Sequence, residues 1–238
     1  MASPEPGNDD LGQAFSRLAQ VIALLRERCA WTAALTHEAL LEYLLEEAYE
    51  VIEAVETGHT RAEDAAELSG ELGDVLLQVL LHARLQEETG NFSILDVVEG
   101  LTAKMVRRNP HVFHPDGTLA ESTTGDPAEI ERAWDAAKKV EKPRRGSPFE
   151  GIPVSLPALA LAAKTQNRAR RAGVAVPAAE TGSGASYGAA VPGWDGEKEL
   201  GDLLFETVRQ ATERGIDPEA ALRGAIRRFT AAASPMTD

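Results

Sequence analysis

Apolar residues recur every three or four positions along almost the whole chain, which is the spacing that lines one face of an α-helix. We find no convincing segment in which apolar and polar residues alternate with the period of two that a half-buried strand shows. The sequence therefore predicts an all-α fold. The expected helices cover about residues 11–28, 40–57, 61–88, 94–108, 127–142, 158–172, 195–214 and 218–232.

Several residues predict where these helices begin and end. Gly58 can end the second helix, because glycine readily adopts the left-handed conformation of a C-terminal cap. Ser93 with Asp96 resembles a capping box at the start of the fourth helix. Asp126 followed by Pro127 offers an N-cap and a first helical residue for the fifth.

Changes in composition divide the chain into parts. Residues 143–157 contain four prolines and are interpreted as a linker, and residues 174–193, rich in Ala, Gly, Ser and Pro, as a flexible loop. We expect a disordered N-terminus over residues 1–10, a first helical domain over 11–142 and a second helical segment over 158–232.

One segment of the sequence occurs twice. Residues 71–77 (ELGDVLL) recur 128 residues later as residues 199–205 (ELGDLLF), and each copy is followed by a helix that ends in two arginines. The helix before the first copy is rich in carboxylates, whereas the stretch before the second offers only Glu180 and Glu197. The second half is therefore interpreted as a duplicated unit that has lost part of its site.

The negative charge of the chain is concentrated in one segment. The whole sequence has 24 Lys and Arg against 38 Asp and Glu, a formal net charge of -14. Residues 38–74 contain twelve acids and a single base, Arg61, so this segment alone carries a charge of -11. Because it is also rich in Leu, Val and Ile, the pattern indicates a built site rather than a merely soluble surface.

The remaining composition narrows the class of protein. Apolar residues make up 43% of the chain, enough for one or two packed domains. Without a block of Lys and Arg, a nucleic acid polymer is not an expected partner. The single cysteine, Cys29, excludes an internal disulfide framework. No apolar run reaches the roughly 18 to 20 residues that cross a bilayer, and the N-terminus is acidic and polar, so we expect a cytoplasmic protein without a membrane partner.

Five carboxylates of the acidic segment are spaced so that they can meet. Glu46, Glu47 and Glu50 project toward one edge of their helix, and Glu71 and Asp74 lie three residues apart on the next. Apolar residues of both helices, including Leu45 and Leu72, would pack them as an antiparallel pair. The carboxylates would then face each other.

Such a cluster resists joint ionisation, and a divalent cation resolves the conflict. Ligation by carboxylate oxygens favours Mg²⁺ or Mn²⁺ over zinc or copper, and Mg²⁺ commonly serves a phosphate-bearing substrate.

Lys104, Arg107 and Arg108 share one helix face and suit phosphate oxygens. Taken singly, the glutamates could be a solvated helix face and the bases could complement the helix dipole. Trp134 could stack on a nucleobase or lie at the rim of the core.

Taken together, these segments resemble the MazG family of nucleoside triphosphate pyrophosphohydrolases. The likeness covers about residues 11–172 well and 195–230 more weakly. The matching segments, in order, are residues 29–31, 36–38, 43–51, 71–79 with 82–84, 104–113, Trp134 with Lys138, 141–142, 151–153 and 156–159.

The resemblance implies an all-α fold that forms a homodimer, and Mg²⁺-dependent hydrolysis of NTPs or dNTPs to the monophosphate and pyrophosphate. It also implies a role in removing damaged or surplus nucleotides. The implied metal ligands are Glu47, Glu50, Glu71 and Asp74, and the implied phosphate-binding residues are Lys104, Arg107 and Arg108. Glu46 is assigned to the attacking water, although Glu46 and Glu47 could exchange roles. Trp134 and Lys138 are expected near the nucleotide.

The chain departs from the family pattern in three places. Ala30 and Thr32 replace a usual Pro and Asp, and Asn109 replaces a common His. The second half lacks a counterpart of the glutamate-rich helix. We therefore expect residues 158–232 to be a degenerate repeat, with Glu199 and Asp202 as structural leftovers and the activity in residues 11–142.

Two other interpretations stay open at this point. A di-iron four-helix protein also gathers carboxylates, but its sites use Glu-x-x-His pairs, and no His follows any of the five clustered acids by three residues. A non-catalytic helical interaction module derived from the same family is the main alternative, and the incomplete second half is its support.

Overall fold

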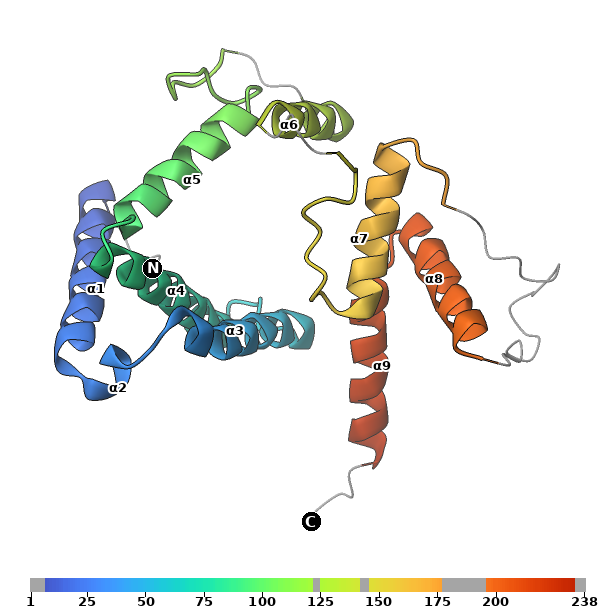
Figure 1. The fold of residues 1–238 in the computed structure, drawn as a ribbon, viewed down its shortest axis with the longest axis horizontal. Coiled ribbons are helices and arrows are strands. Elements are labelled where there is room, and N and C mark those ends of the chain that lie inside the picture. The colour runs from blue at the N-terminus through green and yellow to red at the C-terminus, as the bar shows by residue number, and fades with distance from the viewer. Residues whose placement is uncertain (1–6, 122–124, 142–145, 177–195, 234–238) are drawn as a thin grey trace. The chain divides into compact units, whose positions relative to one another are not determined.

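The computed structural model describes residues 7–121, 125–141, 146–176 and 196–233. Within these ranges every regular element is an α-helix, apart from one isolated β-bridge between Phe113 and Leu119, which confirms the predicted fold class. The helices in Figure 1 are α1 (Asn8–Arg28), α2 (Ala30–Ala33), α3 (His37–Thr57), α4 (Ala65–Glu88), α5 (Ile94–Arg108), α6 (Pro127–Glu141), α7 (Ala158–Arg171), α8 (Glu197–Glu213) and α9 (Pro218–Ala233). Most of the predicted loop 174–193 lies outside the described residues.

The chain forms two compact units, Met1–Glu141 and Lys142–Asp238. The first contains α1 to α6 and the second contains α7 to α9. In the part of the chain that the structure describes, no helix is both long and apolar enough to cross a membrane.

The predicted helix boundaries need three corrections. α1 begins at Asn8, so residues 8–10 are helical and not part of a disordered terminus, while residues 1–6 lie outside the described residues. The short helix α2 was not predicted. α4 begins at Ala65 instead of near Arg61, because the amides of Arg61 and Asp64 bond to carbonyls three residues earlier and form turns.

The predicted helix caps are present. Gly58 has a φ of 99° and ends α3 in the left-handed conformation. The Ser93 amide donates to Asp96 Oδ2 over 2.7 Å at the start of α5. The Ala128 amide donates to Asp126 Oδ1 over 3.0 Å at the start of α6. These contacts are local, which is why the sequence was sufficient to predict them.

The core of the first unit forms where α1 and α3 pack on α4. Its buried residues are Ile22, Leu35, Leu40, Leu80 and Leu81. The expectation that Leu45 and Leu72 pack between α3 and α4 is wrong, since they are 59% and 53% exposed. Helical spacing marks both as apolar positions, but the unit has more such positions than its own core can cover.

Polar contacts hold α1 and α3 in register with α4. Arg26 Nη2 of α1 donates to Glu88 Oε2 of α4 over 2.7 Å. The rings of His37 and His82 stack with their Nδ1 atoms 2.7 Å apart, and Gln86 Nε2 lies 2.6 Å from His37 Nε2. Burial and the neighbouring His37 lower the pKa of His82, so His82 favours its neutral form. These contacts fix the two helices that carry the acidic segment.

In the second unit α7 packs against both α8 and α9. The buried Gln166 donates through Nε2 to the Phe205 carbonyl over 2.7 Å, and Val208 of α8 is buried as well. Arg168 Nη1 donates to the carbonyls of Pro148 and Glu150 over 2.9 and 3.1 Å. The segment that precedes α7 is therefore bound to it by hydrogen bonds.

Candidate active site

Three of the predicted carboxylates converge between α3 and α4. Glu47 of α3 and Glu71 and Asp74 of α4 each offer an oxygen, and these oxygens lie within 4.8 Å of one another. Glu71 and Asp74 share a face because residues three apart on a helix are neighbours. The contact between α3 and α4 brings Glu47 onto that face.

Glu50 and Glu46 lie at the edge of this group. Glu50 lies close enough to Glu47 and Glu71 to raise the pKa of both carboxyl groups, so it acts on acids of the two helices. Glu46 is exposed and its charge helps to raise the pKa of Glu47, but it is not one of the three converging carboxylates. Its carboxylate thus faces solvent beside the cluster.

The proximity of these acids changes their ionisation. Burial, a hydrogen bond with Glu50 and the charge of Asp74 raise the pKa of Glu47 to about 7. Burial, followed by the charges of Glu50, Glu67 and Asp74, raises the pKa of Glu71. The cluster is therefore not fully ionised near neutral pH unless a cation offsets the repulsion. A set of carboxylate oxygens is suited to Mg²⁺ or Mn²⁺, so these residues fit the predicted metal.

The predicted basic residues lie at the C-terminal end of α5 and meet an acid of α6. Arg107 donates to Glu141 Oε1 from Nε over 2.9 Å and from Nη2 over 2.6 Å. Arg108 donates to Oε1 from Nε over 3.1 Å and from Nη2 to Oε2. Lys104 lies one turn earlier on α5 and is half-buried. One carboxylate therefore holds both arginines.

The structure also brings Trp134 and Lys138 of α6 to this position. The Arg108 guanidinium lies 5.3 Å from the centre of the Trp134 ring, and Lys138 Nζ lies 5.7 Å from it. Both distances are within the range of a cation–π contact. The two predicted nucleotide-binding residues and the predicted phosphate-binding Arg108 thus form one group.

Glu141 was not among the predicted site residues. In the sequence it was only one residue of a segment that resembles the family. A usable signal was its spacing, because Glu141 follows Lys138 by three residues and Trp134 by seven and so shares their face of α6.

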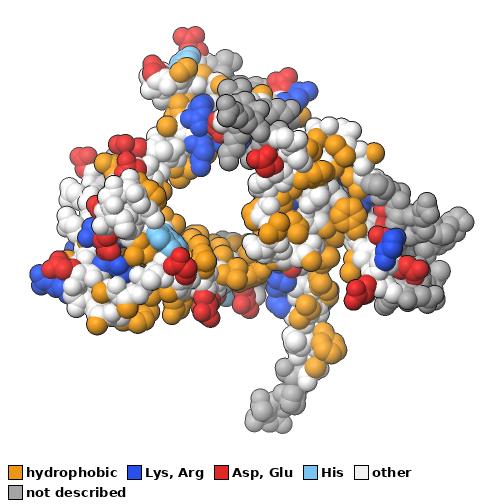
Figure 2. Space-filling view, in the orientation of Figure 1, with side chains coloured by type: hydrophobic (Ala, Val, Ile, Leu, Met, Phe, Trp, Pro, Cys, Tyr) orange, Lys and Arg blue, Asp and Glu red, His pale blue; other side chains and the backbone are white. Residues whose placement is uncertain are grey.

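The acidic and basic groups lie apart within one chain. Asp74 is about 21 Å from the C-terminal end of α4, and Arg107 is about 20 Å beyond the start of α5, at 1.5 Å per helical residue. Figure 1 shows α5 leading away from the α3–α4 pair, and Figure 2 shows Lys and Arg side chains gathered near its far end. A single chain therefore does not bring its basic helix onto its carboxylates.

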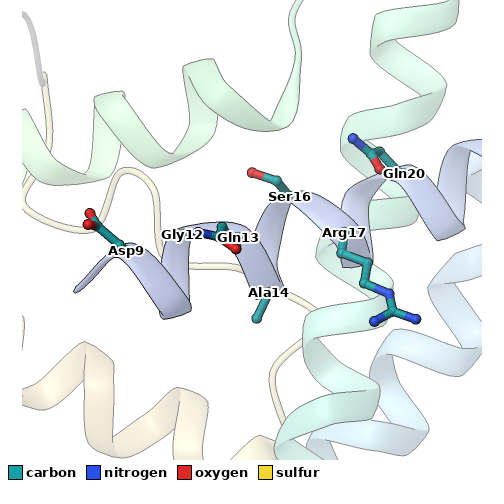
Figure 3. Close-up of a pocket in the computed structure, with 7 residues that line it drawn as sticks. All are labelled: Asp9, Gly12, Gln13, Ala14, Ser16, Arg17 and Gln20. Atoms are coloured by element: carbon teal, nitrogen blue, oxygen red, sulfur yellow. The ribbon is translucent and has the colours of Figure 1, made fainter. Parts of the chain in front are cut away.

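Among the surface hollows of the first unit, two bear on the position of the predicted site residues. One runs along α1 and contains none of the predicted site residues (Figure 3). The other, of about 630 Å³, lies between α5 and the loop after it, with Arg107, Phe113 and Asp116 in its wall. The acidic cluster lines neither of them.

The repeated segment in the second unit is arranged differently. Asp202 receives an ion pair from Lys198 Nζ over 2.6 Å, and Glu199 is exposed. Among the described residues of this unit, no three acidic or histidine side chains converge as Glu47, Glu71 and Asp74 do.

Comparison with known proteins relates this site to a family. The sequence model of the MazG nucleotide pyrophosphohydrolase domain matches residues 35–113, which include the acidic cluster and the basic end of α5. An uncharacterised 26.1 kDa protein of Streptomyces cacaoi is 41% identical to this chain, over 92% of it and 81% of the relative.

Two further relatives have names that describe an activity. The nucleoside triphosphate pyrophosphohydrolase/pyrophosphatase MazG of Thermotoga maritima is 36% identical, over 92% of this chain and 84% of its own. The nucleoside triphosphate pyrophosphohydrolase of Escherichia coli K12 is 34% identical, over 90% of this chain and 84% of its own. With this similarity spread over most of both sequences, the chain belongs to the MazG family of nucleotide pyrophosphohydrolases.

Proposed function

We propose that this protein hydrolyses nucleoside triphosphates, with ribose or deoxyribose, to the monophosphate and pyrophosphate, and so removes damaged or surplus nucleotides from the cytoplasm. The observation that carries the proposal is the convergence of Glu47, Glu71 and Asp74 within 4.8 Å. The names of the Thermotoga maritima and Escherichia coli relatives support the same reaction.

The proposed metal is Mg²⁺, held by Glu47, Glu50, Glu71 and Asp74, and Mn²⁺ could replace it. When bound, the ion supplies positive charge that polarises the α-phosphate and neutralises the leaving pyrophosphate. The raised pKa values of Glu47 and Glu71 support a cation here, because bringing these carboxylates together without one keeps a proton on the cluster.

The remaining roles follow from charge and exposure. Glu46, exposed beside the cluster, orients the attacking water and accepts its proton. Lys104, Arg107 and Arg108 bind the β- and γ-phosphates, because guanidinium groups and ammonium groups match phosphate oxygens. Trp134 and Lys138, next to Arg108, contact the nucleoside.

We further propose that the working enzyme is a homodimer. One chain holds its carboxylates and its basic helix apart, so the second copy would supply the basic helix to the first. Large apolar side chains on three helices of the first unit are at least half exposed and would be covered by a partner copy. They are Leu41, Leu45, Leu72, Leu95 and Leu101.

Catalysis is assigned to the first unit alone. Residues 158–232 are proposed to be a degenerate copy that no longer holds a metal, and Asp202 is already paired with Lys198.

The test is a panel of NTPs and dNTPs incubated with Mg²⁺, with the products separated by chromatography. We expect a monophosphate and pyrophosphate from the wild type. Glu50→Gln should lower kcat/KM by about 100-fold, equivalent to about 2.7 kcal/mol. Glu42→Gln, which changes an exposed acid of the same helix outside the converging group, is the matched control and should stay within about twofold. Orthophosphate as the direct product, or no product from the wild type, would exclude this function.

A further inference from the structure

Glu141 is a carboxylate of α6 that binds both Arg107 and Arg108 of α5. Its side chain is 16% exposed and accepts hydrogen bonds from the Nε and Nη2 atoms of both Arg107 and Arg108. The Arg108 side chain is 15% exposed and that of Arg107 is 54% exposed. Glu141 therefore lies on the inner side of both guanidinium groups, and Arg107 retains an open side toward solvent.

The partners of Glu141 lie on another helix. Arg107 and Arg108 occupy the last turn of α5, where cations are favoured. Glu141 belongs to α6 and meets them from 34 and 33 residues further along the chain. The contact thus pairs one acid of α6 with two favourably placed bases of α5.

Without Glu141, nothing in their helix geometry would bring the guanidinium groups of Arg107 and Arg108 to the same place. Consecutive residues project about 100° apart around a helix, and two guanidinium charges repel each other. Glu141 draws both to one carboxylate through their Nε and Nη2 atoms. The Nη1 atom of each is not used by this carboxylate. Trp134 packs against Arg108 and restricts it further.

We infer that Glu141 is a positioning residue for the triphosphate, because its carboxylate holds Arg107 and Arg108 in the arrangement that receives the β- and γ-phosphates. The inference rests on the proposed function. A long arginine side chain loses rotamer freedom when it binds a phosphate, and that loss is smaller when the side chain is already held. Glu141 therefore tightens substrate binding without touching the substrate.

Glu141 could also weaken triphosphate binding, so the direction of the change in affinity on its substitution tests the inference. Glu141 reduces the positive charge that a triphosphate meets, so an acid that only competed with phosphate would weaken binding. Hydrogen bonds from Arg108 and then Arg107 lower the pKa of Glu141 to about 2, so the carboxylate is ionised throughout the neutral range. Its effect on binding should accordingly not change with pH there.

The experiment compares Glu141→Gln with the wild type in steady-state kinetics with a dNTP and Mg²⁺, and in inhibition by inorganic pyrophosphate. We expect KM and the inhibition constant to rise about tenfold while kcat changes less than threefold, as for an interaction made equally in the ground and transition states. Glu131→Gln, an exposed acid on the same helix, should leave both constants unchanged.

A double-mutant cycle separates positioning from a structural role. In an Arg107→Ala/Arg108→Ala background, Glu141→Gln should raise the pyrophosphate inhibition constant no further, because the residues through which it acts are gone. Glu141→Asp, whose shorter side chain can hold one guanidinium, should give an intermediate KM and serves if Glu141→Gln fails to fold.

The possible outcomes are distinct. An inactive wild type would refute the proposed function and not this inference in particular. An active wild type with an unchanged or lower KM in a folded Glu141→Gln or Glu141→Asp variant would overturn the inference. A lower melting temperature without any change in KM or pyrophosphate inhibition would reduce Glu141 to a structural contact and overturn it as well.

Discussion

Between pH 4.5 and about pH 7, the Glu47 carboxyl group in the folded chain keeps a proton that an exposed glutamate would release. Burial is the first cause, and the hydrogen bond with Glu50 and the charge of Asp74 add to it, so the pKa rises from 4.5 to about 7. Between these two values the folded state binds more protons than the unfolded state. The free energy of unfolding therefore decreases as the pH rises through this interval.

This linkage predicts a pH-dependent difference between the wild type and Glu47→Gln. In EDTA, the melting temperature of the wild type should fall relative to that of the variant between about pH 4.5 and pH 7, since glutamine does not titrate. Millimolar Mg²⁺ should remove the difference by binding the ionised folded state. Differential scanning calorimetry measures both curves, and parallel curves in EDTA would contradict the raised pKa.

At the scale of single elements, helix ends depend on local backbone conformation. Gly58 ends α3 with a φ of 99°, a region that side-chain-bearing residues rarely adopt. Gly70, in contrast, lies inside α4, and an added Cβ there would meet nothing within 4 Å. The two glycines should therefore respond in opposite ways to the same substitution.

We expect Gly58→Ala to destabilise the protein by about 1 kcal/mol, because alanine is strained in the left-handed region. Gly70→Ala should stabilise it by up to about 1 kcal/mol, because alanine favours a helix interior. In a chain of this length each change corresponds to roughly 2 to 4 °C in melting temperature, measured by circular dichroism. If the melting temperature shifted in the same direction in both variants, then either α3 does not end at Gly58 or α4 does not continue through Gly70.

At the scale of the whole molecule, the two copies of the repeated segment occupy different surroundings. Asp74 converges with Glu47 and Glu71, whereas Asp202 at the equivalent position of the second copy pairs with Lys198. The same local sequence therefore lies among other acids in the first copy and next to a lysine in the second.

The repeat supplies a matched pair of substitutions. Glu71→Ala should lower kcat/KM by about 100-fold, because it removes a proposed metal ligand. Glu199→Ala, at the equivalent position of the second copy, should stay within about twofold. Pyrophosphate release measures both, and equal losses would place activity in the second half as well.

Mixing two inactive variants tests whether the site is shared between copies. The Glu71→Gln variant lacks a proposed metal ligand but keeps the basic end of α5. The Arg107→Ala/Arg108→Ala variant keeps all the carboxylates but lacks the two arginines of α5. If each site combines the carboxylates of one copy with the basic helix of the other, a heterodimer regains one working site. Mixed and re-equilibrated, the variants should reach roughly a quarter of wild-type activity. No recovery in a mixture that forms heterodimers would mean that each chain completes its own site.

The sequence by itself determined the helix content and most helix ends, because both depend on residues that are close along the chain. The spacing of apolar residues predicted eight of the helices, and Gly58, Ser93 and Asp126 predicted their caps. The spacing of Glu47 and Glu50, and of Glu71 and Asp74, likewise predicted which acids share a helix face. The start of α4 was misplaced because turn residues there carry a helical pattern.

Only the tertiary structure decided which groups meet across helices. The convergence of Glu47 with Glu71 and Asp74 depends on how α3 packs on α4, and the contact of Glu141 with Arg107 and Arg108 joins residues more than thirty positions apart. The exposure of Leu45 and Leu72 was also beyond sequence reasoning, because helical spacing marks an apolar face without saying what covers it. Local spacing sets the faces of each helix, and packing between distant segments sets their partners and their charge.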